Sequence, residues 1–296
     1  MNVLSLFDGI SCGQVALERA GIIADKYYAS EIDKHAIKVT QHNFPNTIQL
    51  GDIENWRNWD IDWKNINLLI GGSPCQGFSI AGRKLNFDDQ RSKLFFDYLD
   101  ILNHLKIVNP SIRFLLENVR MTDNIADKID ELLGVKKIFI DSRDFTGHIR
   151  KRYYWTNIPI NEWNSKKLTI ENIIDDSPYD KDLNFFLDRT EYAPTTSYDG
   201  IITINPRDNK GKQTWQRGRV YDIKGSCPTI CASLFDLNIT KDHKTYRKLA
   251  INECERLQGI TEGYTSMVGK NDAGNLLGNG WTVDVIAHIF KSISSQ

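Results

Sequence analysis

Cys75 stands where a free thiol could act as a nucleophile. It follows the apolar run Leu68–Ile70, which is typical of a buried strand, and the turn-forming residues Gly71, Gly72 and Pro74. Most free cysteines are small buried hydrophobic residues, whereas a thiol at a strand end that opens into a loop is placed for covalent catalysis. The choice between these two interpretations depends on what the other strand ends bring beside Cys75.

Glu117 is the carboxylate that such a nucleophile would need nearby. It ends the apolar run Phe114–Leu116, which also reads as a buried strand. Neighbouring strands of a parallel sheet end at the same edge, so Glu117 is expected close to Cys75, where a carboxyl group can donate a proton. A glutamate held in a structural ion pair would leave the same sequence pattern.

Three other strand ends carry signals for a nucleoside-containing ligand. The stretch FDGISCG at 7–13 predicts a tight turn after the first strand, where a ligand can approach the backbone closely. Glu31 follows about twenty residues later, at the distance where a carboxylate accepts hydrogen bonds from ribose hydroxyls. Asp52 and Ile53 follow a third strand and could grip an adenine. These residues leave NAD and S-adenosylmethionine both open, and the single glycine turn favours the latter.

The elements that must position these residues alternate in type. Apolar runs predict strands at 3–7, 27–30, 48–50, 68–70, 114–116 and 137–140, and helical spacing predicts helices at 14–20, 33–43, 92–107 and 125–133. This alternation predicts an α/β fold with a doubly wound, mostly parallel sheet. Ligands of such sheets bind at the carboxyl ends of the strands.

The alternation stops at about residue 158. Five of the eight prolines fall between 159 and 228, and basic residues outnumber acidic ones between 205 and 225. We predict a small, irregular domain at 160–245, inserted into a first domain made of 1–159 and 246–296. Helical patterning returns at 250, and a closing helix is expected at 282–290.

Composition limits the class of protein. The 296 residues carry a net charge of −1, so nucleic-acid binding requires an uneven distribution of charge. No apolar run approaches the ~20 residues that span a bilayer, and the first residues do not read as a signal peptide. Five scattered cysteines suit a reducing cytoplasm better than a disulfide framework. Cys227 and Cys231 lack a second pair at zinc spacing, so no metal is expected.

The ordered series FDGISCG, SEID, GDI, GGSPCQGFSIAG, LLENV, HIRKRYYW, RKLAINECERLQG and LLGNGWTV resembles the motifs of cytosine-5 DNA methyltransferases. The resemblance covers nearly the whole chain outside 160–245. Its details look nearest to phage and bacterial members and to the catalytic domains of eukaryotic de novo enzymes. It implies an S-adenosylmethionine-dependent methyltransferase with a Rossmann-like fold, in which 160–245 is the target-recognition domain.

The resemblance also implies a mechanism. Cys75 would add to C6 of a cytosine, Glu117 would hydrogen-bond or protonate its N3 side, Arg152 would hold its O2, and Arg150 would support the pocket. The cofactor S-adenosylmethionine, with S-adenosylhomocysteine as product, would be bound by the residues that match the family's cofactor motifs: Phe7, Gly9, Glu31, Ile32, Asp52, Ile53, Pro74, Leu94, Asn279 and Trp281.

The implied substrate is double-stranded DNA, from which the target cytosine must flip out. The loop Gln76–Gln90 would close over the DNA. Contacts to phosphates and base edges are expected from that loop, from the basic cluster and from a threonine–aliphatic pair, namely Gln76, Ser79, Arg207, Lys212, Arg217, Arg219, Thr229 and Ile230. We expect a monomer in the cytoplasm of a bacterial or phage-infected cell, serving restriction-modification, phage protection or regulation.

Three alternatives stay open. An RNA methyltransferase would share the chemistry, but that branch usually carries a CFT tripeptide, which this recognition region lacks. A non-enzymatic DNA-binding relative would typically have lost the nucleophile or the cofactor motifs. A cysteine-dependent dehydrogenase fits the glycine turn and the thiol but not the later motifs. One departure from the family pattern is His148, where glutamine is usual.

Overall fold

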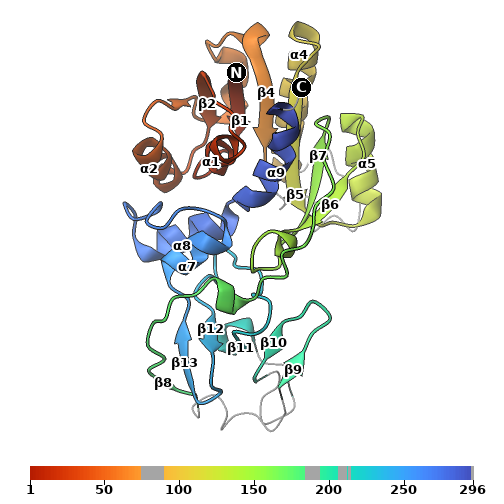
Figure 1. Ribbon diagram of the computed structural model, residues 1–296. Coiled ribbons are helices and arrows are strands. Elements are labelled where there is room, and N and C mark those ends of the chain that lie inside the picture. The colour runs from red at the N-terminus through yellow and green to blue at the C-terminus, as the bar shows by residue number, and fades with distance from the viewer. Residues whose placement is uncertain (75–89, 184–193, 206–211, 213–214, 295–296) are drawn as a thin grey trace. The chain divides into compact units, whose positions relative to one another are not determined.

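The computed structural model describes residues 1–74, 90–183, 194–205, 212 and 215–294 (Figure 1). The chain divides into two compact units, one made of Met1–Ile140, Lys151–Glu162 and Val283–Gln296, the other of Asp141–Arg150 and Trp163–Thr282. Residues 246–282, which the sequence predicted as part of the first domain, therefore cluster with the second unit. The functional boundary at 160 and 245 stays a prediction.

The first unit is built on a seven-stranded sheet in the order β3-β2-β1-β4-β5-β7-β6. The strands from β3 to β5 pair in parallel, and β7 runs antiparallel to β5. This arrangement confirms the predicted α/β class with a mostly parallel sheet. The strands are β1 (Asn2–Leu6), β2 (Lys26–Ser30), β3 (Ile48–Gln49), β4 (Ile66–Gly71), β5 (Arg113–Val119), β6 (Ile138–Asp141) and β7 (Lys151–Thr156).

Helices cover both faces of this sheet, as two consecutive residues of β4 show. A Cβ added to Gly13 of helix α1 (Cys12–Arg19) would lie 2.5 Å from Cδ1 of Ile70. A Cβ added to Gly71 would lie 3.0 Å from the ring of Tyr98 in helix α4 (Gln90–Val108). Because successive side chains of a strand point to opposite faces, α1 and α4 lie on opposite sides of the sheet.

The remaining helices of the first unit follow the same division. Helix α9 (Val283–Ser294) lies beside α1, and Arg19 Nη1 is 2.7 Å from Asp284 Oδ1. Helix α5 (Asp123–Leu133) shares a hydrophobic core with α4. Helix α2 (Lys34–Asn43) begins after Asp33, whose carboxylate accepts a hydrogen bond from the backbone N–H of His35 at 2.8 Å.

The second unit contains a six-stranded sheet in the order β8-β13-β12-β11-β10-β9. Its strands are β8 (Lys181–Asp182), β9 (Thr195–Thr196), β10 (Ile202–Thr203), β11 (Val220–Asp222), β12 (Asn238–Thr240) and β13 (Thr245–Lys248). The described residues of the unit also form the helices α7 (Ile251–Leu257) and α8 (Lys270–Asn279). The segment that looked irregular in sequence is therefore a sheet of strands too short to show alternation.

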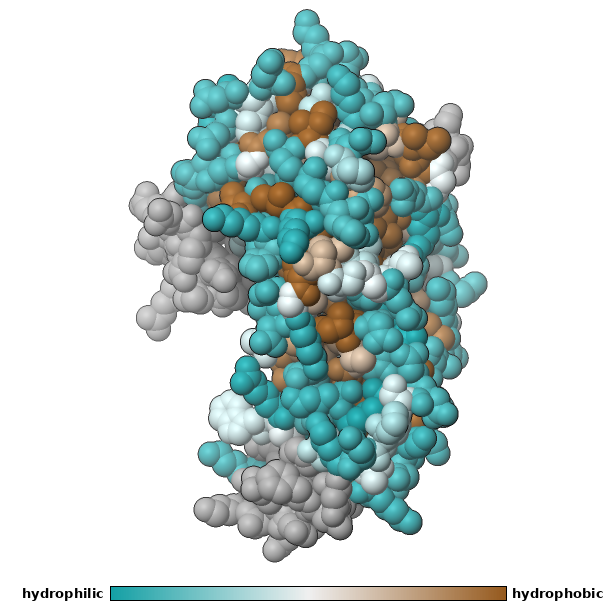
Figure 2. Space-filling model, turned by 90° about the vertical axis from the view of Figure 1, so that its left-hand side faces the viewer, coloured by the Kyte–Doolittle hydropathy of each residue, from teal (hydrophilic) through white to brown (hydrophobic). Residues whose placement is uncertain are grey.

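The face of the molecule shown in Figure 2 is mostly hydrophilic, with apolar residues in patches between the hydrophilic ones. Among the described residues no helix is long and apolar enough to cross a membrane.

Candidate active site

The ends of β1 and β2 are tied together by the carboxylate of Glu31. Its Oε2 accepts a hydrogen bond from the backbone N–H of Gly9 at 2.8 Å, and its Oε1 accepts from Ile32 and Asp33 at 2.8 and 2.9 Å. The turn after β1 has positive φ angles at Phe7 (57°) and Gly9 (58°), which leaves its backbone exposed to close approach. A carboxylate oxygen has more than one acceptor position, so Glu31 keeps capacity for a ligand hydroxyl.

Asp8 lies in the turn after β1 and was not among the site residues predicted from the sequence. Its carboxylate accepts a hydrogen bond from Tyr27 Oη at 2.8 Å and another from the hydroxyl of Ser11. Burial, with a smaller contribution from the nearby Glu31 carboxylate, raises the pKa of Asp8 to about 6 against the hydrogen bonds, which lower it. The signal was present in the sequence, because a carboxylate stands beside the glycine of the first turn.

The predicted adenine-binding residues differ in how far they reach the surface. The side chain of Ile32 is 71% exposed, which is unusual for isoleucine and leaves an apolar face beside Glu31. Asp52 caps a short 3₁₀ helix (Ile53–Asn58) by accepting from the N–H of Glu54 at 3.0 Å. The side chain of Ile53 is only 4% exposed and packs in the hydrophobic core, so its predicted contact with a cofactor stays a prediction.

Two further cofactor candidates, Phe7 and Leu94, are partly buried against the same core, and Pro74 is exposed at the end of the described segment. A carboxylate held by backbone N–H groups next to an exposed aliphatic side chain suits a ribose and an adenine. The residues of this edge therefore fit a nucleoside-containing cofactor. Among the described residues no group of three or more metal-binding side chains gathers.

Glu117 and Arg152 form an ion pair at the end of β5. Val119 of β5 is paired with Arg152 of β7, which places the guanidinium over the strand end, and Arg152 Nε lies 2.8 Å from Glu117 Oε1. The side chains are only 15% and 11% exposed. Arg152 Nη1 also donates to the carbonyl of Lys151 at 2.9 Å, so the pair has a defined orientation.

Asn118 joins the end of β5 to the segment that leads into Cys75. Its Nδ2 donates to the carbonyl of Ser73 at 3.0 Å and to the hydroxyl of Ser73 at 3.1 Å, and its Oδ1 accepts from the N–H of Val119 at 2.8 Å. Cys75, Gln76 and Ser79 lie outside the described residues. The chain enters Cys75 from Ser73 and Pro74, next to the strand that carries Glu117.

Arg150 belongs to the second unit and is only 3% exposed. Its guanidinium donates to the carbonyls of Gly278 at 3.1 Å, Gly280 at 2.7 Å and Asn279 at 3.5 Å. These carbonyls stand at the C-terminus of α8, where a cation is favourable. Arg150 therefore holds the segment that carries Asn279, which is exposed, and Trp281, which is partly buried.

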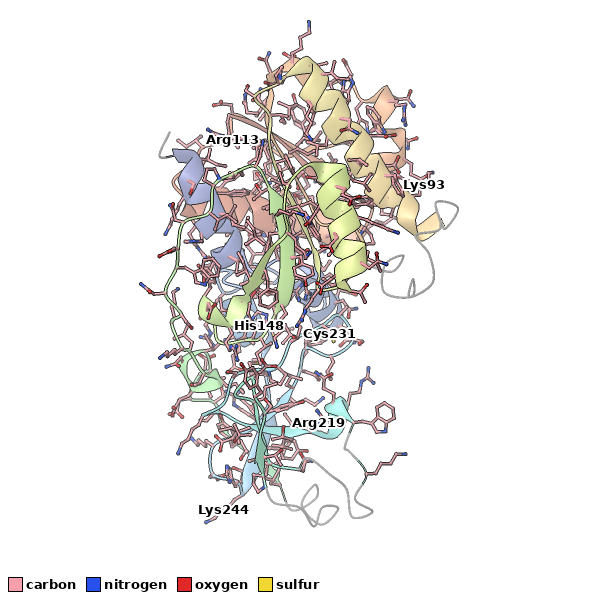
Figure 3. All side chains as sticks on the ribbon, turned by 90° about the vertical axis from the view of Figure 1, so that its right-hand side faces the viewer. Lys93, Arg113, His148, Arg219, Cys231 and Lys244 are labelled. Atoms are coloured by element: carbon pink, nitrogen blue, oxygen red, sulfur yellow. The ribbon has the colours of Figure 1, made fainter. Side chains whose placement is uncertain are left out.

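The predicted DNA-contacting residues of the second unit are only partly at its surface. Lys212 and Arg217 are exposed, and Arg219 is half-buried beside β11 (Figure 3). Ile230 is 0% exposed, so its side chain offers no surface to DNA in this conformation. The neighbouring Thr229 donates its hydroxyl hydrogen bond to the carbonyl of Ile149. Arg207 lies outside the described residues.

His148, the departure from the expected glutamine, is fully buried in the second unit (Figure 3). Its Nδ1 lies 3.1 Å from the hydroxyl of Thr146, and its backbone forms a bridge with Cys227. The histidine is therefore part of the packing that holds the segment before Arg150.

Comparison with known proteins gives a consistent picture. The profile of the C-5 cytosine-specific DNA methylase family matches residues 1–140 and 142–295. The orphan methyltransferase M.Rho11sI of Bacillus phage rho11s is 41% identical over 125 residues, covering 40% of this chain and 23% of that protein. The match thus spans about a quarter of the phage relatives' length. The type II methyltransferase M.HhaI of Haemophilus parahaemolyticus is 27% identical over 324 residues, covering 100% of this chain and 95% of that protein.

Solved structures share the fold at lower identity. The Entamoeba histolytica methyltransferase EhMeth superposes with a TM-score of 0.66 at 18% identity, covering 100% of this chain and 98% of that one. The S. pombe Dnmt2 methyltransferase superposes with a TM-score of 0.63 at 19% identity, covering 100% and 99%.

Proposed function

The chain belongs to the C-5 cytosine-specific DNA methylase family, and from this premise we propose that it methylates the C5 carbon of a cytosine within a short sequence of double-stranded DNA. The family confirms the resemblance that the motifs indicated, and the predicted enzyme class agrees with it. The observation that carries the proposal is the ion pair between Glu117 and Arg152, which lies at a strand end that Asn118 joins to the segment before Cys75.

The cofactor we propose is S-adenosylmethionine. When bound, it supplies an electrophilic methyl group. Glu31 would accept the ribose hydroxyls with its remaining lone pairs, and the exposed side chain of Ile32 would pack on the adenine. Asp52 would contribute a polar contact to the base. Arg150 would act indirectly, by holding the carbonyls on either side of Asn279.

Cytosine C5 is a poor nucleophile, and the chain's own residues would change that. The thiolate of Cys75 would add to C6, which makes C5 enamine-like, while Glu117 donates a hydrogen bond or proton to N3 and Arg152 binds O2. Negative charge that builds on the ring is thereby neutralised at two positions. After methylation, loss of the C5 proton and cleavage of the C6–S bond would restore both the aromatic ring and the thiolate of Cys75.

DNA binding would fall to the second unit and to the loop after Cys75. The exposed cations Lys212 and Arg217 can contact phosphates, which supply most of the non-specific affinity for DNA. The target cytosine must leave the helix at a cost of a few kcal/mol. We further propose that the protein acts as a monomer in the cytoplasm. The four described cysteines, Cys12, Cys227, Cys231 and Cys254, are free thiols, as a reducing compartment allows.

The proposal is tested by expressing the chain in a bacterial host without DNA methylation and sequencing its cytosine methylation at base resolution. The wild type should place 5-methylcytosine in one short motif, and Cys75→Ser should place none. Cys231→Ser, which alters a partly exposed thiol elsewhere, is the matched control and should methylate like the wild type. Unmethylated DNA in cells that contain folded wild-type protein would refute the DNA proposal, and RNA from the same cells would then be examined.

A further inference from the structure

Trp215 is the most exposed tryptophan among the described residues of the chain, with 82% of its side chain accessible. Indole is a large, mostly apolar ring, and such rings usually bury their faces. Single apolar residues on a surface are common and need no explanation by themselves. Trp215 differs because of the way its backbone is held and because of the residues that flank it.

The segment Trp215–Arg219 is held by hydrogen bonds. The N–H of Gly218 donates to the carbonyl of Trp215 at 2.9 Å, and two buried asparagines hold the residues around Gly218. Asn205, which is 2% exposed, donates its Nδ2 to the carbonyl of Gly218 at 2.7 Å, and its Oδ1 accepts from the N–H of Val220 at 2.8 Å. Asn238, which is 5% exposed, donates its Nδ2 to the carbonyls on both sides of Gly218, at 3.2 and 3.1 Å. Side-chain bonds of this kind give an irregular segment a defined conformation.

The segment presents cations and no acids. Its sequence is WQRGR. Its residues Gln216–Gly218 form a 3₁₀ helix shortly before β11. Arg217 Nη2 donates to the carbonyl of Ser233 at 3.1 Å, and Arg219 hydrogen-bonds the hydroxyl of Tyr221. An exposed aromatic ring close in sequence to guanidinium groups is a combination with which proteins bind unstacked nucleic-acid bases.

We propose that Trp215 stacks on a DNA base that loses its neighbour when the target cytosine leaves the helix. This inference rests on the proposed function, because flipping is what exposes a base face inside a duplex. The fixed backbone of Trp215–Arg219 means that little ordering is needed on binding, so the stacking energy is retained. Trp215 would thereby stabilise the flipped state and make affinity depend on the target position.

The test uses a duplex that contains the motif found by methylation sequencing, with 2-aminopurine in place of the target cytosine to report flipping. Trp215→Ala should weaken binding between about fivefold and about 150-fold, the range for one aromatic–base contact, and should lower the 2-aminopurine signal. Trp215→Phe keeps a ring and should stay within about threefold of the wild type. Tyr198→Ala removes an aromatic ring that is 103% exposed elsewhere in the same unit, and it should bind normally.

Salt dependence separates stacking from charge. Stacking releases no counterions, so Trp215→Ala should leave the slope of log K against log salt unchanged, whereas Arg217→Ala should reduce it by about 1. If Trp215→Ala bound the duplex as tightly as the wild type does, or if its melting temperature were lower, the stacking proposal alone would be overturned. Absence of DNA binding by the wild type would instead overturn the proposed function.

Discussion

Replacing Asn118 by alanine is expected to uncouple the nucleophile from the rest of the site. Asn118 is 2% exposed and donates two hydrogen bonds to Ser73, which is itself 4% exposed. Each buried hydrogen bond contributes about 1 kcal/mol, and the buried carbonyl of Ser73 left without a partner costs about 1–3 kcal/mol. The turn that leads into Cys75 would therefore lose about 3 kcal/mol of its stabilisation.

A loosened turn should act on the chemical step. Misplacement of a reacting group by about 1 Å costs on the order of 100-fold in rate, so kcat of Asn118→Ala should fall by about that factor. The KM for S-adenosylmethionine should stay within about threefold, because Glu31 and Ile32 are untouched. Single-turnover methyl transfer to a cytosine duplex measures the first quantity, and steady-state titration measures the second.

Asn109 provides the matched control at the opposite end of β4. Its Nδ2 donates to the carbonyl of Ile66 at 2.7 Å, and its Oδ1 accepts from the hydroxyl of Ser111 at 2.7 Å. Asn109→Ala should lower the free energy of unfolding while keeping kcat within about threefold. The positioning argument fails if Asn109→Ala loses as much activity as Asn118→Ala, or if Asn118→Ala stays active.

Three further outcomes are expected. Glu117→Gln should reduce kcat by about 10²–10⁴-fold, as loss of a general acid does, and calorimetry should show a lower melting temperature, because the mostly buried guanidinium of Arg152 would lose its charged partner. The pKa of Asp8 in the folded state is raised to about 6, above its ordinary value of 3.8. Its contribution to stability is therefore full below pH 3.8 and is lost as pH rises through about 6, so Asp8→Asn should gain melting temperature relative to the wild type between pH 4.5 and 7.5. Gly278→Ala would place a Cβ 2.3 Å from the backbone nitrogen of Ala232 and should destabilise by about 1–3 kcal/mol in urea, whereas Gly269→Ala, with 3.4 Å to its nearest neighbour, should be near neutral.

Most helices and strands of the first unit could be predicted, because the apolar patterns and caps that specify them lie within each element. The helix expected at 33–43 is α2 (Lys34–Asn43), since Asp33 supplies the cap that the pattern required. Strand β7 was not predicted. Its sequence KRYYWT pairs antiparallel with β5, and no residue near it in the chain indicates this partner. The strands of the second unit contain two to four residues, which is too short for alternation to be seen.

The site was predictable only where residue type and strand end agreed. Glu117 was expected near Cys75 because parallel strands end together. Glu117 lies in β5, next to Asn118, which contacts Ser73, but Cys75 lies outside the described residues, so its distance to Glu117 stays a prediction. The contact between Asn118 and Ser73 was not expected. An asparagine after a glutamate is not a recognisable sequence pattern. Its hydrogen bonds to Ser73 depend on the ends of β4 and β5 lying side by side.

Arg150 and Arg152 belong to the same motif, but the motif alone does not show what each side chain contacts. They are two positions apart and chemically identical, yet Arg150 precedes β7 and Arg152 lies within it. The guanidinium of Arg150 donates hydrogen bonds to carbonyls at the C-terminus of α8, so these donors already have partners within the protein. Arg152 faces a carboxylate and keeps part of its surface accessible, so only this arginine combines positive charge with room for a base. The different roles proposed for the two arginines rest on the partners that the fold brings to each guanidinium, and sequence spacing does not contain that information.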